Sequence, residues 1–171
     1  MGTSNESGSQ SPWLTPPYQL TDEDWLKGAS AVKYIVVHCS ATGPDVDYTP
    51  ARMQADHRAR GFRNVGYHYY IRRDGSVTQH RWLLEVGAHC YPHNRRSIGV
   101  CYEGGLDAQG RPRDTRTDSQ RAALVDLLGC LKRLFPQAEI VGHRDLPGTL
   151  PKDCPCFDAK REYGGLSAES R

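Results

Sequence analysis

The order of hydrophobic and polar positions along the chain predicts three short strands. Apolar residues, many of them β-branched, run together at Tyr34–Cys39, at Ser97–Tyr102 and from Glu139 to Gly142. Runs of this length are typical of strands, because helices generally extend over ten or more residues. We therefore interpret each run as a strand, and the first as a buried one.

A first helix is predicted by the signals at its two ends. Thr49 can cap the helix, and Pro50 suits its first position because proline there lacks only an N–H that would have no helical partner. Gly61 provides a stop at the other end. The helix is therefore expected to run from about Pro50 to Arg60.

A second helix begins with a capping box at Thr117–Gln120. Apolar residues continue it at helical spacing, at Leu124, Leu127, Leu128, Leu131 and Leu134. Pro136 ends it, and the segment from Phe157 to Tyr163 is interpreted as a last short helix.

A β-hairpin is predicted between residues 66 and 78. Aromatic and β-branched residues flank the pair Asp74-Gly75, which is a strong short-range hairpin signal. The order of elements is then strand, helix, hairpin, strand, helix, strand, which is typical of an α/β protein. We expect a single domain with a central mixed β-sheet flanked by helices.

The length of 171 residues suits one domain with its own core. We assign residues 31–165 to this domain and residues 166–171 to a C-terminal tail. Residues 1–30 are expected to be disordered or loosely docked, with Trp13 and Trp25 as candidate docking points.

Composition and charge exclude several classes of protein. The formal net charge is only +2, no apolar run is long enough to span a membrane, and no phosphate-binding or dinucleotide-binding motif is present. Arginines cluster between Arg58 and Arg96, which suits either an anionic polymer, such as cell wall or nucleic acid, or a solvated polar surface. No signal peptide is visible, so the sequence leaves a cytoplasmic location and export after signal removal both open.

The six cysteines allow a disulfide framework, because their number is even. A chain of this length folds without such bridges, so we expect free thiols, with a Cys90–Cys101 bridge as the alternative. Cys39, Cys101 and Cys130 lie in apolar patterns and are interpreted as small buried hydrophobic residues.

Two histidines and one cysteine are candidate zinc ligands. His38 and His143 each lie at the end of a predicted strand, close to a loop. Cys154 follows His143 by eleven residues, across a loop rich in turn residues, and Cys156 is an alternative ligand. Two imidazoles and one thiolate leave the fourth zinc position open, as in zinc sites built for catalysis. The pattern therefore indicates a hydrolase.

Several separated motifs resemble those of one family, the zinc-dependent N-acetylmuramoyl-L-alanine amidases of the type shared by bacteriophage T7 lysozyme and the peptidoglycan recognition proteins. The resemblance covers most of the chain, from about Lys33 to Tyr163. The motifs occur in the family's order and are Val37-His38-Cys39-Ser40-Ala41-Thr42, Gly66-Tyr67-His68-Tyr69, Arg73-Asp74-Gly75, Gly142-His143-Arg144-Asp145 and Lys152-Asp153-Cys154-Pro155-Cys156-Phe157-Asp158.

The resemblance implies a T7 lysozyme-like fold and a zinc cofactor bound by His38, His143 and Cys154. It also implies the reaction, which is hydrolysis by zinc-activated water of the amide bond between N-acetylmuramic acid and L-alanine in peptidoglycan. Cys156 departs from the family pattern, in which a serine is common at this position.

Further residues receive roles from the same resemblance. Tyr67 and Lys152 would assist catalysis: the Lys152 ammonium can stabilise the developing oxyanion, and the Tyr67 hydroxyl can donate to the same oxygen or orient the water. His89 and Asn94 lie in a segment that borders the family's substrate groove, which makes them candidate contacts for the muropeptide.

The other histidines are expected to have no direct part in catalysis. His68 alternates with Tyr67 along its strand and should face the opposite side, in a structural role or as the partner of a metal ligand. His57 is expected on a helix surface, and His80 at the end of the hairpin.

Two other functions fit the sequence less well than the amidase. A non-catalytic peptidoglycan-binding module would not need Cys154 and Lys152, and a nucleic-acid-binding protein would need a motif that the chain lacks. The expected partner is therefore peptidoglycan or a muropeptide, bound by a monomer that acts on the cell wall, with neither nucleic acid nor a membrane span involved.

Overall fold

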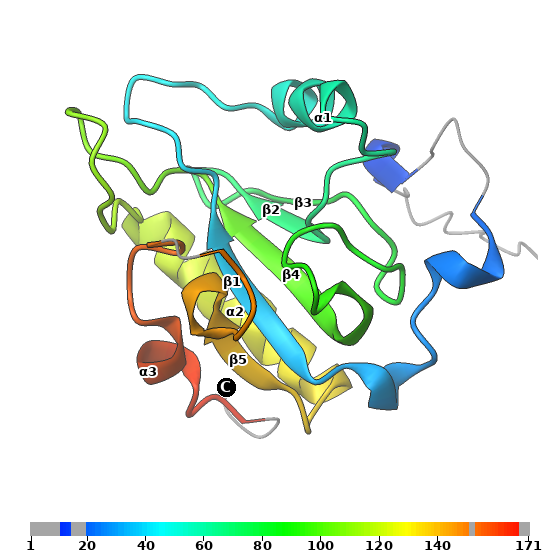
Figure 1. The fold of residues 1–171 in the computed structure, drawn as a ribbon. Coiled ribbons are helices and arrows are strands. Elements are labelled where there is room, and N and C mark those ends of the chain that lie inside the picture. The colour runs from blue at the N-terminus through cyan, green and yellow to red at the C-terminus, as the bar shows by residue number, and fades with distance from the viewer. Residues whose placement is uncertain (1–10, 15–19, 151–152, 168–171) are drawn as a thin grey trace, which may run out of the picture.

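The computed structural model describes residues 11–14, 20–150 and 153–167. A five-stranded sheet with the order β3-β2-β4-β1-β5 forms the centre of this part of the chain (Figure 1). Its strands are β1 (Tyr34–Cys39), β2 (Tyr69–Ile71), β3 (Val77–Gln79), β4 (Ser97–Tyr102) and β5 (Glu139–Gly142). The predicted bounds of β1, β4 and β5 are confirmed.

The sheet is mixed, as predicted. Strand β1 pairs in parallel with both β4 and β5, and β2 pairs in parallel with β4. Strand β3 is antiparallel to β2, and the turn between them contains Gly75 at a positive φ of 85°. The predicted hairpin is confirmed, although its paired strands are shorter than the segment 66–78.

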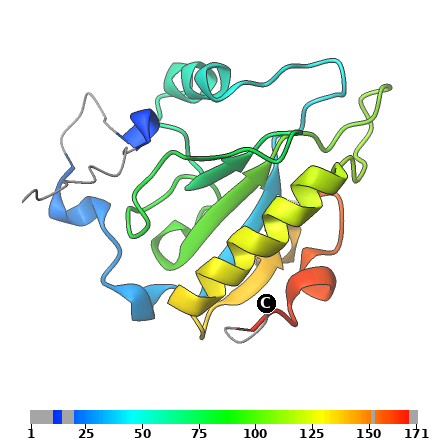
Figure 2. The same cartoon turned by 180° about the vertical axis from the view of Figure 1, so that it is seen from behind.

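Helix α2 (Asp118–Leu134) covers one face of the sheet and crosses it diagonally (Figure 2). Its capping box is formed: Thr117 Oγ1 accepts from the Gln120 N–H at 3.1 Å, and Gln120 Oε1 accepts from the Thr117 N–H at 3.0 Å. Its buried leucines share the main core with residues of four strands, namely Ile35, Val37, Ile71, Ile98, Val100, Tyr102 and Ile140. The predicted helix is therefore confirmed together with its start.

Helix α1 (Pro50–Ala59) lies on the opposite face, where Met53 packs in a smaller cluster with Tyr70 and Cys101. Thr49 caps it by accepting from the Arg52 N–H at 3.1 Å. Side chains alternate across a strand, so Val36 and His38 of β1 point away from α2. The sheet therefore presents His38 on the face that carries α1.

The chain turns sharply where α1 ends, because Gly61 adopts a positive φ of 91°. The N–H groups of Gly61 and Phe62 donate to the carbonyl oxygens of Arg58 and His57, each at 3.0 Å. This pair of bonds is the Schellman arrangement that glycine favours after a helix. It confirms Gly61 as the stop of this helix.

The remaining helices are short. Helix α3 (Ala159–Tyr163) lies beside β5 and begins later than predicted, because Asp158 caps it by accepting from the Arg161 N–H at 3.0 Å. Five 3₁₀ helices complete the described elements: Pro12–Leu14, Asp22–Asp24, Ala29–Ala31, Asn94–Arg96 and His143–Asp145.

Both tryptophans of the N-terminal segment contact the rest of the protein. The Trp13 carbonyl accepts from Asn64 Nδ2 at 3.2 Å, and its ring lies 5.5 Å from the His80 ring between centroids. Trp25 forms a backbone bridge with Glu85. None of the described helices is both long and apolar enough to cross a bilayer.

The cysteines and two of the histidines differ in part from the predictions. All six cysteines are free thiols, as expected, but Cys130 is exposed because it lies on the side of α2 that faces away from the sheet. The surface position predicted for His57 is wrong, because α1 presses that residue against the domain, where His57 Nδ1 accepts from the Gly66 N–H at 2.9 Å. His80 does lie at the end of the hairpin, but it is fully buried beneath Trp13.

Candidate metal centre

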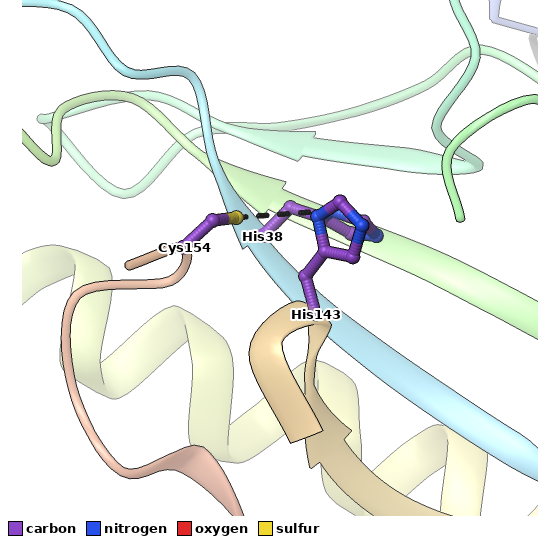
Figure 3. A group of neighbouring side chains, drawn as sticks. All are labelled: His38, His143 and Cys154. Atoms are coloured by element: carbon purple, nitrogen blue, oxygen red, sulfur yellow. Dashed lines mark hydrogen bonds between the residues drawn. The ribbon is translucent and has the colours of Figure 1, made fainter. Parts of the chain in front are cut away.

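Three potential metal ligands meet at one edge of the sheet (Figure 3). His38 is near the end of β1, His143 directly follows β5, and these strands are parallel neighbours, so both histidines emerge at the same edge. Cys154 comes from the loop that returns to this edge. One ligand atom from each of the three lies within 4.8 Å of the other two. The separation between Cys154 Sγ and His38 Nδ1 is 3.8 Å.

The return of the loop is fixed by backbone hydrogen bonds. The Cys39 N–H donates to Cys154 Sγ at 3.3 Å, and the Arg144 N–H donates to the Cys154 carbonyl at 3.0 Å. The buried Tyr102 hydroxyl donates to the carbonyl oxygen of Pro155 at 2.6 Å. These bonds hold the thiol of Cys154 beside the histidines.

Cys156, the alternative ligand, points elsewhere. Its thiol donates to the Gly105 carbonyl at 3.3 Å and lies 3.9 Å from Cys39 Sγ. Cys156 adopts a positive φ of 71°, so the segment is not extended and the alternation expected of a strand does not apply to it. Of the two cysteines, Cys154 is the one that the fold brings to the histidines.

Tyr67 lies next to the three ligands. Its ring centroid is 5.0 Å from that of His38. Burial raises the pKa of Tyr67 well above its ordinary value, so the hydroxyl stays protonated at neutral pH and can donate a hydrogen bond. Lys152, the other residue expected to assist catalysis, lies outside the described residues.

His89 and Asn94 both reach the site, and each already has protein partners. His89 Nδ1 is 2.8 Å from His38 Nε2. Asn94 Oδ1 accepts from the N–H groups of His89 and Cys90, each at 2.9 Å. Burial, with His68 and His143 nearby, holds the pKa of His89 well below its ordinary value, so this ring is neutral.

His68, which precedes β2, is fully buried. Its Nδ1 accepts from the Gly99 N–H at 3.0 Å, and its Nε2 is 2.6 Å from the Glu85 carbonyl oxygen, to which it donates. Both ring nitrogens are engaged with backbone, so the role of His68 is structural.

A cavity of about 700 Å³ opens over the three ligands. Its floor includes Tyr67, His89 and Asn94, so the structure brings every described residue of the predicted site into one cavity. A second cavity of about 450 Å³ lies beside the first and shares Ser40, His57, Arg60 and Tyr67 with it.

The walls of this cavity are formed by residues that were not predicted to belong to the site. Arg60 and Phe62 form one wall, and the guanidinium of Arg60 lies 4.9 Å above the Phe62 ring. Tyr91 and Leu150 also line the cavity and are largely exposed, at 82% and 73%. Gly61 was the sequence signal that could have indicated the wall formed by Arg60 and Phe62, because this glycine turns the chain between them.

The arrangement suits metal-assisted hydrolysis. Two imidazoles and one thiolate can hold a metal and leave a further position open toward the cavity. Sulfur and nitrogen donors favour zinc over magnesium or calcium, which prefer oxygen ligands. A protonated hydroxyl beside the ligands adds a donor for a developing oxyanion.

Comparisons with known proteins agree with this chemistry. The family described as N-acetylmuramoyl-L-alanine amidase matches residues 28–157. The endolysin of Enterobacteria phage K11 is 42% identical over 125 residues, which cover 73% of this chain and 81% of the endolysin. The endolysin of Escherichia phage T7 is 39% identical over 136 residues, which cover 80% of this chain and 88% of that protein.

A solved structure shares the fold. The N-acetylmuramoyl-L-alanine amidase LysC from Clostridium intestinale URNW superposes with a TM-score of 0.65 at 25% sequence identity. The superposition covers 85% of this chain and 90% of the LysC chain.

Proposed function

The chain belongs to the N-acetylmuramoyl-L-alanine amidase family, and we propose that it cleaves peptidoglycan at a zinc ion held by His38, His143 and Cys154. It is a peptidoglycan amidase, and the family's reaction is hydrolysis of the amide bond between the lactyl group of N-acetylmuramic acid and the L-alanine of the stem peptide. The observation that supports zinc is the cluster of two imidazoles and one thiolate on the cavity floor.

The spacing of the donor atoms fits the ion. Zinc binds nitrogen at about 2.0 Å and sulfur at about 2.3 Å, so two tetrahedral ligand atoms of these kinds lie roughly 3.5 Å apart. Cys154 Sγ and His38 Nδ1 are 3.8 Å apart, so only a small adjustment would complete this pair. When bound, zinc would supply a Lewis acid for the amide carbonyl and lower the pKa of water to about 7.

Two residues of the chain would support the chemical step. The Tyr67 hydroxyl, which burial keeps protonated, would donate to the oxyanion that develops when the amide carbonyl is attacked. The ammonium of Lys152, two residues before Cys154 in the sequence, would stabilise the same negative charge. The role of Lys152 rests on its place in the sequence.

The cavity would hold the muropeptide. Its volume of about 700 Å³ lies within the range of small-molecule sites. Asn94 uses its oxygen to hold backbone, and no partner for its amide nitrogen lies among the described residues, so this nitrogen is available to substrate. His89 forms the adjacent part of the cavity floor and is the second candidate contact.

Residues 31–165 would form the catalytic domain. This domain would act as a monomer. Peptidoglycan as substrate places that action at the cell wall.

The proposal is tested by single replacements assayed on purified peptidoglycan for release of new N-terminal alanine. His38→Ala and Cys154→Ser should abolish release while leaving the circular dichroism spectrum unchanged. Cys156→Ser is the matched control and should stay active, because that thiol faces Gly105. A non-catalytic recognition module would bind peptidoglycan without releasing alanine in any variant. Full activity of His38→Ala would contradict the proposed site.

A further inference from the structure

The His38 ring lies between two neighbours that approach its two different nitrogens. Cys154 Sγ is 3.8 Å from Nδ1, and His89 Nδ1 is 2.8 Å from Nε2. Only a nitrogen without a proton can bind a metal, so the hydrogen bond at Nε2 decides whether Nδ1 is ready to act as a ligand.

The hydrogen bonds beyond His89 set the direction of that bond. His89 Nε2 is 3.3 Å from Ser97 Oγ, and the buried Ser97 hydroxyl donates to the His93 carbonyl oxygen at 2.8 Å. A carbonyl oxygen can only accept, so the Ser97 hydroxyl must use its one proton in the hydrogen bond to this oxygen. Ser97 Oγ is then an acceptor for the proton on His89 Nε2.

The acceptor role of Ser97 Oγ determines which ring nitrogen of His89 and of His38 carries a proton. With its proton on Nε2, His89 offers a lone pair at Nδ1, which accepts from His38 Nε2–H. His38 then carries its lone pair on Nδ1, the nitrogen that faces Cys154. The thiol of Cys90 lies 3.3 Å from Ser97 Oγ and 3.9 Å from His89 Nε2. Through the shorter contact it donates to the second lone pair of the Ser97 oxygen, which leaves the proton on His89 Nε2.

The His89 ring is held in place by close packing. A Cβ atom added at Gly99 would lie 2.7–2.9 Å from three atoms of the ring, and one added at Gly87 would lie 2.6 Å from its Cδ2. Asn94 Oδ1 also holds the backbone at this point, because it accepts from the N–H groups of His89 and Cys90. The ring fills space that two glycines leave open, so it has little freedom to turn.

We propose that His89 is a positioning residue, which with Ser97 holds His38 in the Nε2–H form and presents His38 Nδ1 to the metal. This inference rests on the proposed zinc site, and it gives His89 a role beyond substrate contact. Groups that orient a metal-binding histidine commonly contribute ten- to a hundredfold to metal affinity.

The test is a zinc titration against a chromophoric chelator. His89→Ala should weaken zinc binding by about ten- to a hundredfold. Ser97→Ala should weaken it by a smaller factor of about three- to tenfold, because His89 stays in place and loses only the hydroxyl that accepts from its Nε2–H. His89→Asn should recover part of the loss, because its Oδ1 occupies the place of Nδ1 and still accepts from His38 Nε2. His80→Ala, which removes a buried histidine away from the cavity, should bind zinc as the wild type does.

The visible spectrum of the cobalt-substituted proteins adds a readout of ligand geometry. A positioning role predicts altered d–d bands in His89→Ala and bands closer to the wild type in His89→Asn. Wild-type affinity in His89→Ala, or equal losses in the Ala and Asn variants, would overturn the inference. Failure of the wild-type protein to bind zinc would instead overturn the proposed function, so the two failures are distinguishable.

Discussion

Replacing Gly99 by alanine tests the packing of His89 without removing any polar atom. Gly99 lies in β4 opposite Val36 of β1, and its φ is not in the positive range, so alanine suits its backbone. The new Cβ would lie 2.7 Å from Cγ, 2.8 Å from Nδ1 and 2.9 Å from Cδ2 of His89, so the ring must move. Overpacking of this kind costs about 1–3 kcal/mol, and the gain from replacing a strand glycine offsets about 0.5–1 kcal/mol of it.

The expected net loss is therefore up to about 2.5 kcal/mol, which corresponds to a fall in Tm of up to about 10 °C for a domain of this size. Zinc affinity should fall as well, because the displaced Nδ1 atom is the acceptor for His38. Calorimetry and zinc titration measure the two effects. Gly129→Ala is the matched control, since its Cβ would meet only Arg133 Nη1 at 3.9 Å. Unchanged Tm and unchanged zinc affinity in Gly99→Ala would refute the packing argument.

Four further outcomes are expected. Gly129→Ala, in the interior of α2, should raise the free energy of unfolding by about 1 kcal/mol, and unchanged or lower stability in calorimetry would contradict this. Thr117→Ala removes the cap of α2 and should lower the free energy of unfolding by about 1 kcal/mol in urea titrations, whereas an unchanged midpoint would show that the cap contributes nothing. Tyr67→Phe should lower kcat about a hundredfold with little change in zinc affinity, and wild-type kcat would remove Tyr67 from the chemical step. Burial lowers to about 4 the pKa of three histidines whose ordinary value is 6.5, namely His57, His68 and His80. Below pH 6.5 these histidines bind protons in the unfolded chain but stay neutral in the folded chain. Each therefore contributes up to about 3 kcal/mol to the free energy of unfolding above pH 6.5, and this contribution is lost as the pH falls toward 4. Urea titrations at pH 7 and pH 5 with a chelator present measure this loss, and equal stability at both would contradict it.

Local sequence signals predicted the parts of the fold that depend on near neighbours. Strands β1, β4 and β5 follow from short, mostly apolar runs, and the start of α2 follows from the pairing of Thr117 with Gln120. His38 and His143 could be selected as candidate ligands because each lies at the end of a predicted strand, close to a loop.

The remaining features depend on contacts between distant segments. The burial of His57 requires knowing which face of α1 meets the domain, and the pattern of α1 alone does not show this. The choice between Cys154 and Cys156 depends on the path of a loop held by the N–H of Cys39. The contact of His89 with His38 joins residues 51 positions apart. None of these contacts leaves a local sequence pattern.

The most direct test of the proposed function is mass spectrometry of the products formed from a defined muramyl peptide. The wild-type protein should release free N-acetylmuramic acid and a peptide with N-terminal L-alanine, lose this activity in a chelator and regain it with zinc. Cys154→Ser should give no products, and Cys156→Ser should give the same pair as the wild type. Cleavage of a different bond would contradict the proposed zinc amidase. Formation of the same products by Cys154→Ser in the presence of the chelator would contradict it as well.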